Sequence, residues 1–261
     1  MEFGILGPLL VRDDSGPRAV PAGKQRILLA ALLVRPEQTV SLETLADLLW
    51  DGRPPQSHVA TMRNYVMRLR RRLGTAGYRV KTGLGGYRID VGKHEFDVLR
   101  FARLRGAGAA AFRAGGYEEA ARLAGEALAV WRGPVLEDVP SDTLRRDEAP
   151  RLDRMRLEAM ELKLAAELMP GGRSGLVPEL RALTAEHPDR ERFWAQLMVA
   201  LVRDGRRGEA LVVYQEAQRT LARHLGTEPG VQLRQVHRGI QTDISTLESP
   251  LRALVLEPAS R

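Results

Sequence analysis

The clearest hydrophobic pattern in the chain lies between Ser57 and Leu73. Apolar residues recur there at steps of four, three and four, at Met62, Val66, Leu69 and Leu73. That spacing places them on one stripe of an α-helix, which can pack on a core. The intervening positions are mostly polar or cationic, so the pattern predicts a helix with one buried face and one exposed face.

Shorter patterns precede this helix. Strand-like runs around a turn at residues 13–17 predict a small antiparallel sheet, expected to have four strands. Apolar residues at helical spacing predict a first helix over 23–34 that Pro36 limits, and a second over 42–50 with Ser41 as its N-cap. Pro54 and Pro55 then separate the second helix from the third.

A hairpin is predicted after Gly74. The β-rich runs YRVKT and YRID are joined by a glycine-containing turn at 83–86, which favours a hairpin with a flexible tip. Three helices followed by a hairpin is the order of a winged helix-turn-helix, in which the third helix enters the DNA major groove. The predicted fold class of this part is therefore α+β, with a small antiparallel sheet, three helices and a wing hairpin.

The rest of the chain has helical patterning from about Val98, after a junction at the HEFD segment. Residues 104–127 and 194–217 share one alternation of small and large side chains at an offset of 90 positions, which is typical of tetratricopeptide-like helical hairpins. A plain helical bundle is the alternative, because two such units are fewer than a stable array usually needs. A long helix is also predicted over about 147–168. The expected domains are 1–93, 94–250 and a flexible tail over 251–261.

Charge adds a functional indication. The formal net charge is +7, and residues 1–93 carry all of it, with 15 Lys or Arg against 8 Asp or Glu; the remainder has 25 of each. A basic lobe on a neutral body indicates a domain that binds a polyanion, attached to a part with another role.

Several functional classes lack support in the sequence. There is no Cys, and the five His have no metal-ligand spacing, so we predict no metal. No phosphate-binding loop or catalytic constellation occurs, so we predict no cofactor and no enzymatic activity. No apolar run reaches membrane length and no signal-peptide pattern follows Met1, so we expect a cytoplasmic, nucleoid-associated protein.

The exposed face of the third helix carries candidate DNA contacts. Residues 62–72 hold five Arg and no acidic residue, whereas an ordinary solvated face mixes both signs. Arginine suits guanine O6 and N7, and asparagine suits adenine, so the expected base-edge and adjacent phosphate contacts are Arg63, Asn64, Arg68 and Arg71. The expected phosphate contacts are Thr61, Lys24, Arg26, Lys81 and Thr82. Arg70 and Arg72 are expected to pair within the protein.

The string LETLADLLWDGRPPQSHVATMRNYVMRLRRRLG, the KTGLGGYRID wing and the helical body together resemble the Streptomyces antibiotic regulatory proteins. These are bacterial transcription activators built from an OmpR-type winged helix and a bacterial transcriptional activation domain. The resemblance covers about residues 1–250, and LLW, the double proline, YVMRLRRRL and GGYRI are its most specific parts.

The resemblance implies a sequence-specific activator of secondary-metabolite (antibiotic) biosynthesis genes. It implies binding to direct repeats in double-stranded promoter DNA near the −35 element, as a homodimer on DNA. It also implies recruitment of RNA polymerase holoenzyme through its sigma and alpha subunits. The polymerase-contact candidates lie in the loop between the second and third helices: Asp51, Arg53 and Gln56. A simple connector stiffened by prolines is the alternative for that loop.

One part of the wing departs from the family pattern. Many relatives carry a basic or proline-bearing tip, whereas this chain has Gly83 and Leu84, which argues against a strong minor-groove contact. A different class of protein is also compatible with the sequence: a helical-repeat interaction adaptor with a nonspecific basic lobe. Such an adaptor would show no preference among DNA sequences.

Overall fold

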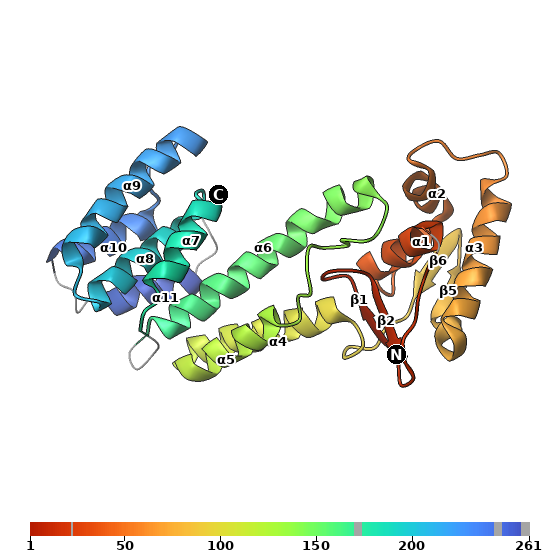
Figure 1. Ribbon diagram of the computed structural model, residues 1–261, viewed down its shortest axis with the longest axis horizontal. Coiled ribbons are helices and arrows are strands. Elements are labelled where there is room, and N and C mark those ends of the chain that lie inside the picture. Colours follow the sequence, from red (N-terminus) through yellow and green to blue (C-terminus); the bar gives the residue numbers. More distant parts are fainter. Residues whose placement is uncertain (22, 170–173, 243–246, 257–261) are drawn as a thin grey trace. The chain divides into compact units, whose positions relative to one another are not determined.

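The computed structural model describes residues 1–21, 23–169, 174–242 and 247–256 (Figure 1). The chain divides into two compact units, which we treat separately. The first unit contains Met1–Leu104 and Ala127–Leu157, and the second contains Arg105–Glu126 and Glu158–Arg261. The divisions fall inside helices α4 (Asp97–Arg113), α5 (Tyr117–Leu128) and α6 (Asp142–Glu167).

The first unit begins with an antiparallel sheet in the order β1-β2-β3. Its strands are β1 (Glu2–Gly4), β2 (Leu10–Asp13) and β3 (Gly16–Pro17). Among the residues described, this sheet has three strands, so the expectation of four was wrong. The outer edge of β1 instead meets residues next to α4: Phe3 forms a single parallel bridge with Phe96, and its N–H donates to the carbonyl of Glu95 at 2.6 Å.

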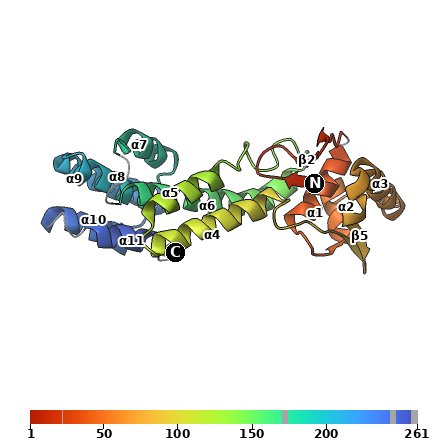
Figure 2. The ribbon, with the colours of Figure 1, turned by 90° about the horizontal axis from the view of Figure 1, so that it is seen from below.

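Three helices follow in the positions that the apolar spacing predicted: α1 (Gly23–Val34), α2 (Leu42–Trp50) and α3 (His58–Arg72). Figure 2 shows them grouped beside β5. Ser41 is the N-cap of α2, because its hydroxyl accepts a hydrogen bond from the Thr44 N–H at 3.1 Å. The predicted winged helix-turn-helix is confirmed.

The wing hairpin consists of β5 (Val80–Gly83) and β6 (Gly86–Ile89), with β4 (Val40–Ser41) on the other side of β6. The first strand starts later than the YRVKT run suggested, because a 3₁₀ helix occupies Gly74–Arg79. Gly86 is required by close packing: a Cβ there would stand 2.0 Å from the carbonyl oxygen of Val40. The backbone contact between β4 and β6 therefore depends on this glycine.

A segment far along the chain packs on the N-terminal strand region. The Arg132 N–H donates to the carbonyl of Leu6 at 2.8 Å, and the Leu136 N–H donates to that of Ile5 at 3.1 Å. Asp97, the first residue of α4, accepts from the N–H groups of both Ile5 and Leu6 and from Nη2 of Arg132. Burial raises the pKa of the Asp97 carboxyl, although these hydrogen bonds act in the opposite direction.

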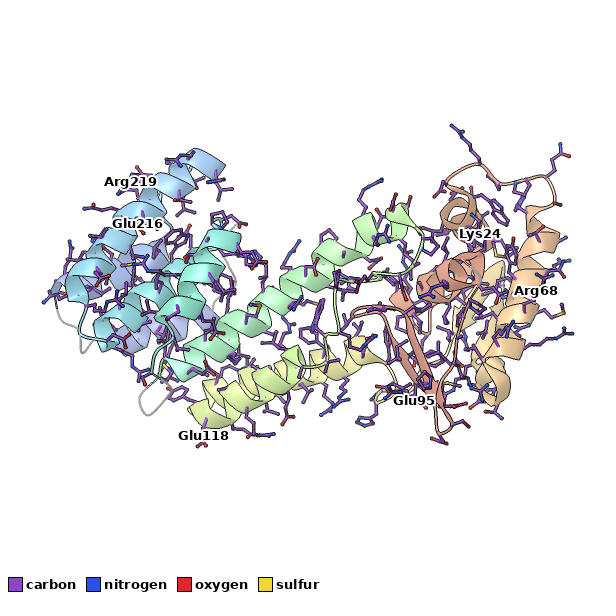
Figure 3. All side chains as sticks on the ribbon, viewed as in Figure 1. Lys24, Arg68, Glu95, Glu118, Glu216 and Arg219 are labelled. Carbon is purple, nitrogen blue, oxygen red and sulfur yellow. The ribbon has the colours of Figure 1, made fainter. Side chains whose placement is uncertain are left out.

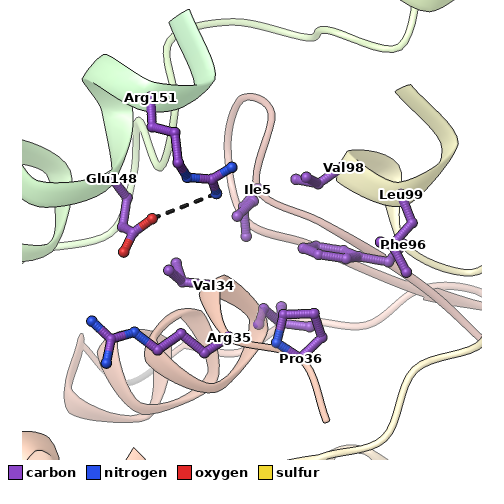
Figure 4. A pocket seen from close by; sticks show the side chains of 10 residues that line it. Ile5, Val34, Arg35, Pro36, Phe96, Val98, Leu99, Glu148 and Arg151 are labelled. Carbon is purple, nitrogen blue, oxygen red and sulfur yellow. Dashed lines mark ion pairs between the residues drawn. The ribbon is translucent and has the colours of Figure 1, made fainter. Parts of the chain in front are cut away.

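A pocket of about 380 Å³ opens in this unit (Figure 4). Apolar side chains from the end of α1 and the start of α4 line it, including Leu33, Phe96 and Leu99. Glu148 and Arg151 of α6 stand at the pocket as an ion pair, with 3.6 Å between nitrogen and oxygen.

The second unit contains helices and no strand among its described residues. Besides parts of α4, α5 and α6 it contains α7 (Val177–Glu186), α8 (Glu191–Arg203), α9 (Arg207–Leu225), α10 (Val231–Thr242) and α11 (Glu248–Leu256). The helix predicted from about 147 starts earlier, at Asp142, where the Ser141 hydroxyl accepts from the Leu144 N–H at 3.3 Å. The expected tail begins at 251, inside α11, and Leu251 is buried. Residues 257–261 lie outside the described residues.

The two predicted hairpin units form matching turns. Gly115 joins α4 to α5 and Gly205 joins α8 to α9, both at positive φ, 83° and 76°. The Gly116 N–H donates to the carbonyl of Ala111 at 2.9 Å, and the Arg206 N–H donates to that of Leu201 at 2.8 Å. The offset of 90 positions in the sequence therefore corresponds to a repeated local geometry.

Candidate nucleic-acid interface

Helix α3 is held by the apolar stripe that its sequence predicted. Met62, Val66 and Leu69 are each at most 1% exposed. Burying these residues fixes the rotation of the helix about its own axis, because turning it would bring polar side chains into the core. Figure 3 shows the opposite face around Arg68 directed away from α1 and α2.

The four predicted base-contact residues share that outward face. Arg63, Asn64, Arg68 and Arg71 are exposed, and none of their side chains makes a hydrogen bond or ion pair with the residues that the structure describes. The surface of a 15-residue helix, about 22 Å long, thus presents three guanidinium groups and one amide. Such donors can bind base edges or phosphates.

Arg70 lies at the edge of this face and is used internally. Its Nε donates to the carbonyl of Val80 at 2.8 Å, and its Nη2 donates to Oγ1 of Thr82 at 3.1 Å. This confirms that Arg70 pairs within the protein. Arg72, for which the same was expected, is exposed, and its side chain has no hydrogen bond or ion pair within the described ranges.

An open groove of about 630 Å³ runs between the end of α3 and the wing. Arg70, Arg71, Tyr78, Lys81 and Thr82 are among its lining residues. The structure thus places three predicted DNA contacts, Arg71, Lys81 and Thr82, around one groove. Lys81 also pairs with Asp90, so part of its charge is neutralised.

The two predicted phosphate contacts at the start of α1 have internal partners. Lys24 Nζ donates to the carbonyl of Leu49, and Arg26 forms an ion pair with Asp138. Partial burial disfavours the charged carboxylate of Asp138, but hydrogen bonds from Arg26 and from the Leu9 N–H outweigh it and lower the pKa. These contacts favour structural roles for Lys24 and Arg26, and their role in DNA binding stays a prediction.

The remaining predicted residues lie at both ends of the α2–α3 connection. Thr61 is half-buried in the first turns of α3. Asp51, Arg53 and Gln56 are all exposed, and Asp51 ends α2 in a left-handed conformation with φ 52°. The turn after the prolines is closed by a hydrogen bond from the His58 N–H to the carbonyl of Pro55 at 2.9 Å.

One residue of the outward face was not among the predicted contacts. Met67 is 43% exposed and lies one helical turn from both Arg63 and Arg71. Its outward position follows from the helical spacing alone, and the structure adds how far it is exposed.

Comparison with known proteins agrees with this architecture. Residues 20–89 match the family model described as "Transcriptional regulatory protein, C terminal". Residues 96–241 match the "Bacterial transcriptional activator domain" model. The fold and these two matches define a two-domain architecture of the bacterial transcriptional regulator class, with an OmpR-type winged helix followed by a helical activator domain.

Whole-chain relatives define the family. The regulatory protein DnrI of Streptomyces peucetius is 34% identical over 249 residues, covering 92% of both chains. The transcriptional regulator RedD of Streptomyces coelicolor is 35% identical over 264 residues, covering 99% of this chain and 75% of RedD. The chain belongs to the family of Streptomyces antibiotic regulatory proteins.

A solved structure has the same fold. The structure of Mycobacterium tuberculosis EmbR in complex with a low-affinity phosphopeptide matches with a TM-score of 0.88 at 34% identity, covering 96% of this chain and 68% of that one. In sequence, EmbR is 37% identical over 246 residues, and the match spans 63% of the length of EmbR.

Two further findings concern the described residues alone. No helix among them is both long and apolar enough to span a membrane. Within the same ranges, His, Asp and Glu form no group that could hold a metal ion.

Proposed function

We propose that this protein is a transcription activator that binds specific promoter sequences through α3 and recruits RNA polymerase. The observation that carries the proposal is the exposed face of α3 formed by Arg63, Asn64, Arg68 and Arg71. The side chains of these residues make no hydrogen bond or ion pair within the described residues. These side chains extend from a helix whose orientation the buried stripe determines. Because the helix backbone is already ordered, binding to DNA does not have to order it again, which lowers the entropy cost of binding.

The family supports the finer parts of the proposal. We propose that two protomers bind direct repeats near the −35 element, in promoters of secondary-metabolite genes. The groove beside the wing is suited to the sugar-phosphate backbone, since Arg71 and Thr82 line it and both are exposed. We propose that the protein acts in the cytoplasm, on the nucleoid.

Selection of binding sites from random double-stranded DNA tests the central claim. A recovered motif, repeated at a spacing close to a helical turn, is the expected result. With about six phosphate contacts, log affinity should fall against log salt with a slope of roughly −0.9 per contact. An unenriched pool would instead favour a protein-interaction adaptor with a nonspecific basic lobe.

Arg68→Ala tests base reading by α3. Loss of a bidentate guanine contact should weaken binding to the selected site by about 1–3 kcal/mol and binding to random DNA much less. Arg103→Ala is the matched control, because Arg103 is exposed on α4 and the same charge is removed away from α3. Equal losses on both kinds of DNA would assign Arg68 to the backbone.

We propose that the loop between α2 and α3 contacts RNA polymerase. Its support is the exposure of Asp51, Arg53 and Gln56 on a connection stiffened by two prolines. Arg53→Ala should leave DNA affinity unchanged and lower transcription in a purified system with polymerase holoenzyme. Unchanged transcription from Arg53→Ala, Asp51→Ala and Gln56→Ala would leave the loop as a connector.

A further inference from the structure

Met67 is an apolar residue of α3 that does not pack in the core. The apolar stripe of this helix is at most 1% exposed, whereas Met67 is 43% exposed. It lies on the outward face, one turn after Arg63 and one turn before Arg71. A flexible, polarizable thioether side chain therefore stands in the middle of a cationic face.

The polar neighbours of Met67 can bind the hydrogen-bonding groups of the bases in a major groove but not the methyl group of thymine. Arginine and asparagine form hydrogen bonds with guanine and adenine, but the C5-methyl of thymine is apolar and needs an apolar partner. Asn64 and Arg68 flank Met67 on the helix and are polar to their tips. Within this face, Met67 offers the long apolar side chain that such a methyl group requires.

We propose that Met67 determines specificity by contacting the C5-methyl group of a thymine in the major groove. The inference rests on the proposed function, since it requires α3 to enter that groove. It also predicts a position. Helical rise places Met67 about 6 Å along the axis from Arg63 and from Arg71, so the thymine should lie within about two base pairs of those that these residues contact.

The 261-residue chain and its selected DNA site provide the test. Each thymine of the site is replaced in turn by deoxyuridine, which deletes the methyl group and leaves the hydrogen-bonding groups in place. One replacement should lower the affinity of the unaltered protein about fourfold, as expected for the loss of one buried methyl. Replacements elsewhere in the site should have little effect.

Variants at Met67 then connect the methyl group to this side chain. Met67→Ala should bind the thymine and deoxyuridine sites equally, because the apolar partner is missing in both cases. Met67→Gln keeps the length but adds a polar end, and should also lose the discrimination. Met67→Leu keeps an apolar side chain and should retain it. Unchanged thermal melting by circular dichroism checks that the variants are folded.

The outcomes separate this inference from the function on which it rests. Specific binding that no deoxyuridine replacement weakens would overturn the methyl contact and leave DNA reading by α3 standing. If deoxyuridine replacement weakened the binding of Met67→Ala as much as that of the unaltered protein, the methyl contact would be overturned in the same way. A protein with no preference among DNA sequences would overturn both proposals together.

Discussion

Arg70 on α3 donates a hydrogen bond from Nη2 to Oγ1 of Thr82 on β5 at 3.1 Å. The same guanidinium donates from Nε to the carbonyl of Val80 at 2.8 Å. One side chain of the helix therefore holds the wing beside it. The groove between them takes its shape from this connection, because both Arg70 and Thr82 line it.

Arg70→Ala should lower the free energy of unfolding by about 1–3 kcal/mol, because hydrogen bonds from a charged donor to β5 are lost. Amide hydrogen exchange should become faster in β5 (Val80–Gly83). Urea unfolding and exchange mass spectrometry measure the two effects. Arg72→Ala is the control, because Arg72 is exposed on the same helix. If both variants lose the same stability, charge and not the connection to β5 is responsible.

Asp97→Ala should be among the most destabilising single changes in the first unit. The carboxylate is 5% exposed and accepts hydrogen bonds from two backbone N–H groups and from Arg132. Removing it leaves the N–H groups of Ile5 and Leu6 buried without a partner, at an expected cost of about 2–5 kcal/mol. Urea unfolding measures this loss. Asp142→Ala, whose carboxylate is 83% exposed, should change stability by less than about 0.5 kcal/mol.

Glu95 makes the stability of the protein depend on acid pH. The hydrogen bond from Arg79, with 2.7 Å between Nη2 and Oε1, lowers the pKa of the Glu95 carboxyl, and the Gly92 N–H adds to this. Because the pKa of Glu95 is lower in the folded protein than in the unfolded chain, its ionised carboxylate stabilises the folded state at pH values above the unfolded-state pKa of about 4.3. This stabilisation is lost as the pH falls through the folded-state pKa.

Glu95→Gln should therefore lower the free energy of unfolding at pH 7. Below about pH 4, the free energies of unfolding of the variant and the unaltered protein should become similar. Urea midpoints measured from pH 2.5 to 7 test this. A constant difference across the whole range would show that the titration of Glu95 does not contribute.

Asp138 should limit the contribution of Arg26 to DNA binding. Asp138→Asn keeps an oxygen that can accept from the Leu9 N–H but removes the negative charge beside Arg26. Released in this way, Arg26 should raise DNA affinity and steepen the salt slope by about 0.9, the value of one phosphate contact. Fluorescence anisotropy over a salt series measures both. If adding Arg26→Ala to the Asp138→Asn variant changes neither the DNA affinity nor the salt slope, Arg26 has a structural role only.

Local patterns were sufficient for the three helices α1, α2 and α3. The positions of α1 and α2 follow from apolar periodicity and from Ser41, which caps α2 through its own side chain. The buried and exposed faces of α3 follow in the same way, because side-chain direction on a helix depends on spacing alone. The repeated turns at Gly115 and Gly205 also follow from a pattern in the sequence.

Long-range partners could not be predicted in this way. Arg70 and Arg72 lie two positions apart on α3, and both were expected to pair within the protein. Only Arg70 meets β5, whereas Arg72 stays exposed. Likewise, the ion pair of Arg26 with Asp138 joins positions distant in the chain.

The sequence by itself thus determined the elements, their order and the amphipathic character of α3, since these depend on neighbours within a few residues. Only the tertiary structure decided which charged side chains are neutralised and which remain exposed. The physical reason is that an ion pair or hydrogen bond requires two groups to meet within a few ångströms, and folding brings such groups together from distant positions.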